Sequence, residues 1–137
     1  MATTNATLTL TSADLTGDAL SLSTTATLTT STSATTGLSE TTGVARKNYA
    51  SASANQVILD ADDYTADKAH KFYIKNCSTT ASNTVQIHVT NPTGPVIHDL
   101  GTLYGGDWAF FPYDADKDIA ISTVGSNVTV EYMLIFE

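Results

Sequence analysis

Acidic side chains at alternating positions are the first residues of this sequence whose spacing suits a chemical task. Asp114, Asp116 and Asp118 have the spacing that opens an EF-hand calcium loop. Such a loop also requires glycine at its sixth position and glutamate at its twelfth, where this chain has Ile119 and Gly125. We therefore expect a solvated turn here, with adventitious cation binding as the alternative.

A second acidic cluster precedes the middle of the chain and comprises Asp60, Asp62, Asp63 and Asp67. Its carboxylates are ligands that hard cations accept. An exposed loop that keeps the surface soluble explains them as well. We favour the loop, and we expect a short helical turn within it because acidic residues suit a helix start.

The histidines and the cysteine show no catalytic arrangement. His70, His88 and His98 lack the close spacing of metal ligands, so we expect ordinary surface or edge residues. Cys77 has no base nominated near it and no second cysteine with which to form an internal disulfide, so a structural thiol is expected. Nucleophile-elbow, phosphate-loop and dinucleotide motifs are missing. The sequence predicts a protein that is not an enzyme, with no catalytic residue, cofactor or metal.

The densest aromatic run surrounds the single tryptophan. Exposed Tyr104 and Trp108 rings would suit stacking on sugar rings, whereas packing in the core or at a subunit interface is the preferred interpretation. Gly105-Gly106 predicts a tight turn. The strand that follows should direct Trp108 and Phe110 to one face and Phe111 to the other, and Pro112 should end it.

Composition limits the partners of this 137-residue chain. Its net charge is −8 with only six Lys and Arg, which argues against nucleic acid because phosphate backbones require clustered cations. It contains no long apolar run, so we expect no membrane partner and no signal peptide. Charged residues make up 15% of the chain, and hydroxyl side chains replace them, which suits β-structure and permanent contacts.

Residues 1–43 form a Thr/Ser-rich N-terminal arm. Leucines alternate with hydroxyl residues through two runs, Thr7 to Thr11 and Ala19 to Thr30, which predicts a β-hairpin with one thin apolar face. A flexible linker is the alternative, with Ser31 to Thr42 its most mobile part. A hairpin of this kind needs a covering surface. We expect inter-subunit contacts through Leu8, Leu10, Leu20, Leu22, Leu28, Tyr104, Trp108 and Phe111.

Residues 44–137 predict a β-sandwich domain. The clearest alternation lies in the segments 72–75, 85–90 and 128–136, and shorter strands are expected at 44–50, 56–60, 96–100 and 119–121. About ten short strands without a helical period predict an all-β antiparallel sandwich or jelly-roll-like fold.

Parts of the second half resemble small virion structural proteins of tailed bacteriophages, particularly marine and cyanobacterial ones. The matching segments are 72–76, Val85-x-Ile87-x-Val89, 103–112 and 130–137, within a resemblance that covers roughly residues 71–137. The resemblance implies a particle component located in the virion. It carries no catalytic residues.

We therefore expect a capsid decoration or cement protein that stabilises the head through β-rich contacts. Its expected partners are further copies of itself, with a trimer on a particle axis the working hypothesis, and other virion proteins such as the major capsid protein. The alternative is a tail fibre or appendage subunit that binds host glycans. A metal-dependent jelly-roll enzyme is a weaker third possibility.

Overall fold

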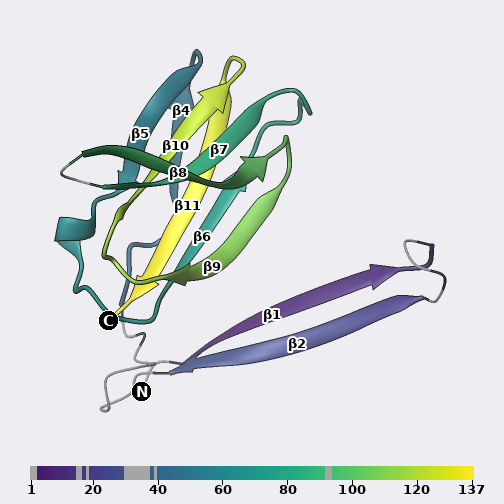
Figure 1. The fold of residues 1–137 in the computed structure, drawn as a ribbon. Coiled ribbons are helices and arrows are strands. Elements are labelled where there is room, and N and C mark those ends of the chain that lie inside the picture. The colour runs from purple at the N-terminus through teal and green to yellow at the C-terminus, as the bar shows by residue number, and fades with distance from the viewer. Residues whose placement is uncertain (1–2, 15–16, 18, 30–37, 39, 92–93) are drawn as a thin grey trace.

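The structure is a computed structural model that describes residues 3–14, 17, 19–29, 38, 40–91 and 94–137. It is an all-β antiparallel sandwich with an N-terminal Thr-rich hairpin, as the two-residue alternation predicts (Figure 1). Within these ranges the elements are β1 (Thr3–Ser12), β2 (Leu20–Thr29), β3 (Glu40–Thr41), β4 (Ala45–Tyr49), β5 (Ser53–Leu59), the 3-10 helix η1 (Ala61–Asp63), β6 (His70–Asn76), β7 (Thr84–Asn91), β8 (Gly94–Leu103), β9 (Trp108–Tyr113), β10 (Asp118–Val124) and β11 (Val128–Phe136).

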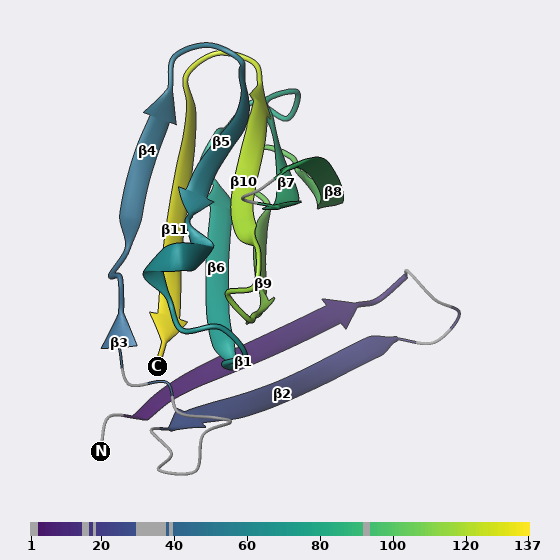
Figure 2. The same ribbon diagram turned by 60° about the vertical axis from the view of Figure 1, so that its left-hand side comes forward.

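Two antiparallel sheets form the sandwich. One has the strand order β5-β10-β7-β8, and the other has the order β3-β11-β6-β9 with β4 also paired to β11. Strand β11 pairs with β6 along one edge and with β4 and β3 in succession along the other. Figure 2 shows β4 and β3 following each other beside β11. The last strand of the chain therefore lies inside its sheet.

The core lies between the two sheets and is built from alternate residues. In β6 the inward positions carry Phe72 and Ile74, which are fully buried, while Tyr73 between them faces outward. The same alternation buries Val85 and Ile87 in β7. The remaining fully buried apolar side chains of β10 and β11 include Ile121, Val128, Val130 and Leu134.

A buried amide fixes the turn between β6 and β7. Asn76 is inaccessible to solvent, and its Nδ2 donates to the carbonyl oxygens of Asn83 (2.8 Å) and Leu103 (3.2 Å). Its Oδ1 accepts from the backbone N–H of Ser78 at 3.0 Å. All the hydrogen-bonding capacity of this amide except one acceptor position is used, which is what burial of a polar group requires.

Strands β8 and β9 each contain a proline. Strand β9 continues through Pro112, which pairs with Lys71 of β6, and β8 includes Pro95. The prediction that Pro112 ends its strand is therefore wrong. Strands β8 and β9 each lie at an edge of their sheet, where a missing N–H can face away from the ladder.

The acidic loops are held by their own side chains. Asp60 caps η1 by accepting the Asp62 N–H at 3.1 Å, so the expected helical turn is present as one short 3-10 turn. Asp114 and Asp116 are exposed, as a solvated turn requires. Asp118 is different: it is 7% exposed and its Oδ1 accepts the Ala61 N–H at 2.9 Å. This carboxylate joins the two acidic loops.

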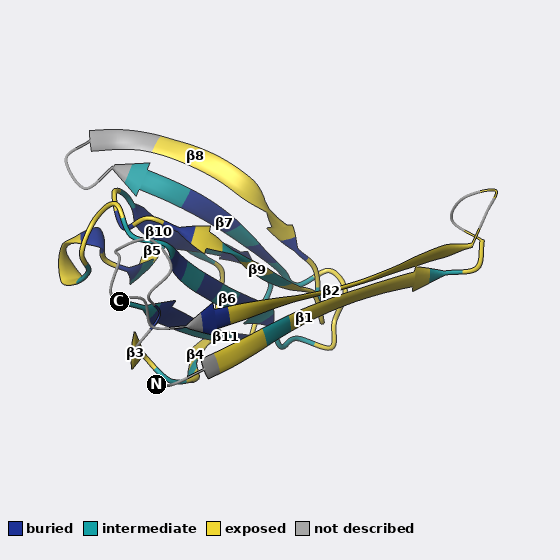
Figure 3. Cartoon of the chain, turned by 90° about the horizontal axis from the view of Figure 1, so that it is seen from below, coloured by how far each residue is buried: buried dark blue, intermediate teal, exposed yellow. Residues whose placement is uncertain are grey.

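The hairpin of β1 and β2 extends away from the sandwich (Figures 1 and 2). Figure 3 shows it exposed along most of its length, with a buried stretch where β2 approaches the sandwich. The sandwich itself begins at β3, which pairs with the end of β11, and Thr42 continues this contact through a backbone N–H bond to the Leu134 carbonyl at 3.0 Å. Most of the expected mobile segment 31–42 lies outside the described residues.

Candidate functional site

The hairpin has two chemically distinct faces. Strands β1 and β2 pair without a bulge from Thr3↔Thr29 to Ser12↔Leu20, so residues opposite each other share a face. Leu10 lies opposite Leu22, and Ala6 opposite Ala26. We call this side the leucine face; it comprises Ala6, Leu8, Leu10, Leu20, Leu22, Thr24, Ala26 and Leu28.

The opposite side is a hydroxyl face whose side chains bond to each other across the strands. Thr7 Oγ1 and Thr25 Oγ1 are 2.9 Å apart, and Thr27 donates to Asn5 Oδ1 at 3.1 Å. Neither strand contains a charged residue or a proline. The paired hydroxyls leave this face hydrated, so any contact through burial of apolar area must use the leucine face.

Burial on the leucine face is greatest at the end next to the sandwich. Leu28 is 8% exposed and packs with Leu38 and Ile135. Leu8, Leu10, Leu20 and Leu22 are 37%, 44%, 37% and 45% exposed. Of the five leucines expected at an interface, Leu28 therefore makes an intramolecular contact, and the other four are open to solvent.

An aromatic strip lies on the outer face of the sandwich, on the side that faces the hairpin. It consists of Tyr73 of β6 with Trp108 and Phe110 of β9, which share a face because Tyr73 pairs with Phe110. Trp108 is 53% and Phe110 38% exposed. Phe111 points the other way, as predicted, and meets the core ring of Phe72 with centroids 5.4 Å apart.

The leucine face and the aromatic strip are the two walls of an apolar groove. Its volume is about 360 Å³, and it is lined by Ala6, Thr7, Leu8, Thr24, Ala26, Tyr73, Trp108 and Phe110. Glu131 lies on the same outer face: it accepts from Tyr73 Oη at 3.1 Å and pairs with Arg46 at 2.6 Å. The Arg46 guanidinium, with the Tyr73 hydroxyl, holds the pKa of Glu131 below its usual value.

The turn before β9 carries the remaining candidate aromatic residue. Tyr104 is 55% exposed. Next to it, Gly106 has the positive φ that the sequence predicts, whereas Gly105 has a different role. A Cβ at Gly105 would lie 2.4 Å from the Thr80 carbonyl oxygen, so only glycine lets these two backbones approach.

The same turn borders a polar hollow of about 600 Å³. Arg46, Lys75, Cys77 and Gly105 are among its lining residues. Arg46 already forms an ion pair with Glu131. The free thiol of Cys77 is half-buried there. This hollow gathers two cations of an acidic chain, but it presents no histidine that could act as a base.

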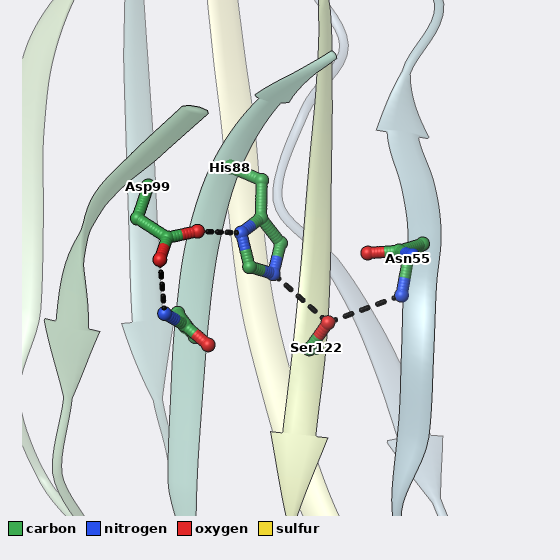
Figure 4. Close-up of polar contacts among 5 residues, drawn as sticks. Asn55, His88, Asp99 and Ser122 are labelled. Carbon is green, nitrogen blue, oxygen red and sulfur yellow. Dashed lines mark hydrogen bonds and ion pairs between the residues drawn. The ribbon is translucent and has the colours of Figure 1, made fainter. Parts of the chain in front are cut away.

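The structure also assembles a polar chain that sequence reasoning missed. The His88 Nδ1 atom is 2.7 Å from Asp99 Oδ1, and its Nε2 atom is 2.8 Å from Ser122 Oγ (Figure 4). Asn55 donates its backbone N–H to the same Oγ at 3.1 Å, and Gln86 donates to Asp99 at 2.9 Å. The four central residues come from β5, β10, β7 and β8, so the chain crosses the whole sheet.

This arrangement has the connectivity of a Ser-His-Asp nucleophilic triad. Two features favour a structural role. The Ser122 Oγ atom already accepts the Asn55 N–H, and neither the apolar groove nor the polar hollow includes Ser122 or His88. All three hydrogen bonds can also run in one direction. Asn55 then donates to Ser122, Ser122 donates to His88, and His88 donates to Asp99. Such a chain satisfies every group and joins four strands.

Two histidines depart from the prediction of surface residues. His88 is 4% exposed and His70 is fully buried, whereas His98 is exposed as predicted. His70 Nε2 is bonded to the Thr65 carbonyl at 2.9 Å, and its ring lies about 6 Å from the rings of Tyr64 and Tyr113. No sequence signal marks these partners, because strand pairing and loop closure bring them together.

Further observations bear on metals and membranes. Among the described residues, no group of three or more His, Cys, Asp and Glu side chains could hold a metal ion. The same part of the chain contains no helix of the length and apolar character needed to span a membrane.

Comparison with known proteins identifies no family. No family model matches the chain, and no curated protein matches it. Among solved structures, the catabolite activator protein of Thermus thermophilus aligns with 68% of this chain at 21% identity and a TM-score of 0.29. The chain covers 38% of that protein. A likeness at this score carries no argument about fold or function.

Proposed function

We propose that this chain is a non-enzymatic structural subunit of a larger particle and that its hairpin is the contact arm. The observation that carries this proposal is the projecting hairpin with four leucines 37–45% exposed on one face. Contiguous apolar surface of this kind marks interaction sites in soluble proteins. Covering the exposed part of each leucine contributes about 1 kcal/mol, so the four together supply roughly 3–4 kcal/mol to an association.

The particle that we propose is a bacteriophage virion, with the chain as a decoration or cement protein on the capsid. This step is supported by the resemblance of segments 72–76, 103–112 and 130–137 to small virion proteins. The major capsid protein and further copies of the chain are the proposed partners. Two open strands without charge or proline also suit addition of strands from a neighbour.

The test changes the leucine face of the full-length protein and leaves the sandwich intact. Leu8, Leu10, Leu20 and Leu22 are all replaced by threonine, which keeps the strand preference and removes the apolar surface. We expect the variant to fold and to be lost from purified particles. A matched control with Thr9→Ser, Thr11→Ser and Thr25→Ser alters the hydroxyl face and should keep full occupancy. Unchanged occupancy of the threonine variant would refute the contact arm.

A tail appendage that binds host glycans is the second candidate, because Tyr104 and Trp108 are 55% and 53% exposed. Exposed aromatic faces of this kind suit sugar rings. On a glycan array, Trp108→Ala should abolish binding, whereas Val57→Ala, which removes a 48% exposed side chain of the other sheet, should not. An array without any binding by the unchanged protein would remove this candidate.

A further inference from the structure

We infer that the apolar groove receives the outer leucines of a second copy of this chain (Leu10, Leu20 and Leu22), in a two-fold pair whose leucine faces lie against each other. The inference rests on the proposed function, since it names the partner of the contact arm.

The groove is open on the side of the hairpin tip. At the sandwich end the leucine face is closed against its own sheet by Leu28 and Ile135. Further along the hairpin, Leu8 of β1 and Thr24 of β2 form one wall of an open groove, and Trp108 forms the other. The leucines nearer the tip are exposed. The space is therefore a wedge that opens towards the tip, and its own hairpin cannot fill it because that hairpin is one of its walls.

The absence of charged side chains from β1 and β2 favours a second copy of this chain as the partner. The chain carries a net charge of −8, so two copies repel each other over most of their surface. The twenty residues of β1 and β2 include no charged side chain, so here two copies can approach without that repulsion. The described residues of the connection between the strands include Asp14, which stays exposed at the tip and lies outside the leucine face.

Symmetry and the area that must be buried both favour a two-fold arrangement of the two hairpins. An apolar face that meets its own copy about a two-fold axis is self-complementary, and this is the commonest form of homo-oligomer. Leu10 and Leu22 near one tip then cover Leu8 and Thr24 of the other copy, and the reverse. One hairpin face alone is small beside the ~800 Å² per partner of a stable interface. Entry of the outer leucines of each copy into the partner's groove adds the aromatic strip to the buried area.

Face-specific cross-linking tests the pair in the full-length protein. In a Cys77→Ser background, Thr24→Cys places a thiol on the leucine face near the proposed axis, and Thr25→Cys places one on the hydroxyl face one residue away. Under mild oxidation we expect a disulfide-linked dimer from Thr24→Cys and at least tenfold less from Thr25→Cys. Light scattering after size exclusion should give twice the chain mass of 14.4 kDa for the Cys77→Ser protein.

Point substitutions supply the matched controls. Leu10→Thr with Leu22→Thr should convert the dimer to a monomer and suppress the Thr24→Cys cross-link, whereas Thr9→Ser should leave both unchanged. Equal cross-linking from the two cysteine positions, a dimer that survives Leu10→Thr with Leu22→Thr, or a trimeric mass would each overturn the two-fold pair.

The failure of this inference can be told apart from failure of the proposed function. A protein that is monomeric at all concentrations, yet still occupies particles through its leucine face, overturns the pair and retains the contact arm, whose partner is then another virion protein. A protein that dimerises as described but keeps its particle occupancy after the four leucine changes supports the pair and refutes the arm as the particle contact.

Discussion

Single side chains from distant strands hold the β5-β10-β7-β8 sheet together across its width. His88 has two partners, Asp99 at 2.7 Å and Ser122 at 2.8 Å, and it is almost inaccessible to solvent. Buried polar groups are costly when a partner is lost, because the group that remains is neither hydrated nor bonded. The His88 chain is therefore a sensitive point of the fold.

We predict that His88→Ala lowers the free energy of unfolding by about 2–4 kcal/mol, from a lost imidazole volume and two lost hydrogen bonds. Urea denaturation followed by tryptophan fluorescence measures the change. The control His98→Ala, at an exposed position, should stay within about 0.5 kcal/mol. A double-mutant cycle with Ser122→Ala should give a coupling of at least about 0.5 kcal/mol. Additive effects would contradict the chain.

Alkaline pH should weaken the fold through Tyr113. Burial, followed by the carboxylates of Asp118 and Asp114, raises the pKa of Tyr113 well above its usual value of 10.0. The folded state therefore retains the phenolic proton at a pH where the unfolded state has lost it. The resulting stability is fully present below pH 10 and is lost as pH rises above it.

The measurement is the urea midpoint between pH 8 and pH 11.5. Tyr113→Phe should flatten the alkaline decline. At neutral pH it should cost about 1 kcal/mol, because the Tyr113 hydroxyl donates to the Lys117 carbonyl at 2.9 Å. Exposed Tyr104→Phe serves as the control and should leave the pH profile unchanged. A decline of the same steepness in Tyr113→Phe would contradict this origin.

At the scale of elements, period-two alternation was sufficient to predict the hairpin and strands β6, β7 and β11. It predicts which residues share a face but not what covers that face. His88 lies on the polar side of β7, and its burial depends on Asp99 and Ser122 of two other strands. Pro112 is tolerated because β9 is an edge strand, and edge positions follow from strand order, which local sequence does not encode.

The turn between β8 and β9 depends on a close backbone approach. Gly105→Ala would place a Cβ 2.4 Å from the Thr80 carbonyl oxygen, which is backbone and cannot rotate away. We expect a loss of roughly 2 kcal/mol or more in the free energy of unfolding. Gly101→Ala is the matched control, because no atom lies within 4 Å of its added Cβ. Equal urea midpoints for the two variants would contradict the close approach.

At the scale of the whole molecule, the hairpin and the sandwich have separate clusters of buried residues. The residues of the main core extend from Tyr49 to Leu134, and the hairpin reaches the sandwich through a small cluster around Leu28, Leu38 and Ile135. Because the main core is much larger than the cluster around Leu28, we expect the sandwich to fold without the hairpin.

A chain that begins at Glu40 should therefore fold as a monomer. We expect a loss of about 1–3 kcal/mol from exposure of Ile135 and Met133, with near-ultraviolet circular dichroism preserved. Thermal denaturation and size exclusion measure the outcome. A chain that begins at Asn55 also lacks β4 and the buried Tyr49, and should not fold. An unfolded Glu40 chain would show that the hairpin is part of the main core.

The central place of β11 has a consequence during synthesis. Strands β3, β4 and β6 all pair with β11, at sequence separations from 54 positions (Asn76 to Val130) to 96 positions (Glu40 to Phe136), so this sheet cannot close until the ribosome has made β11. The hairpin, whose ends are near neighbours along the chain, can form in microseconds. A nascent polypeptide thus displays its leucines to the crowded cell for seconds before its sandwich exists. On a polysome, where sister chains emerge side by side, the pairing of arms that we propose would precede folding of the sandwich.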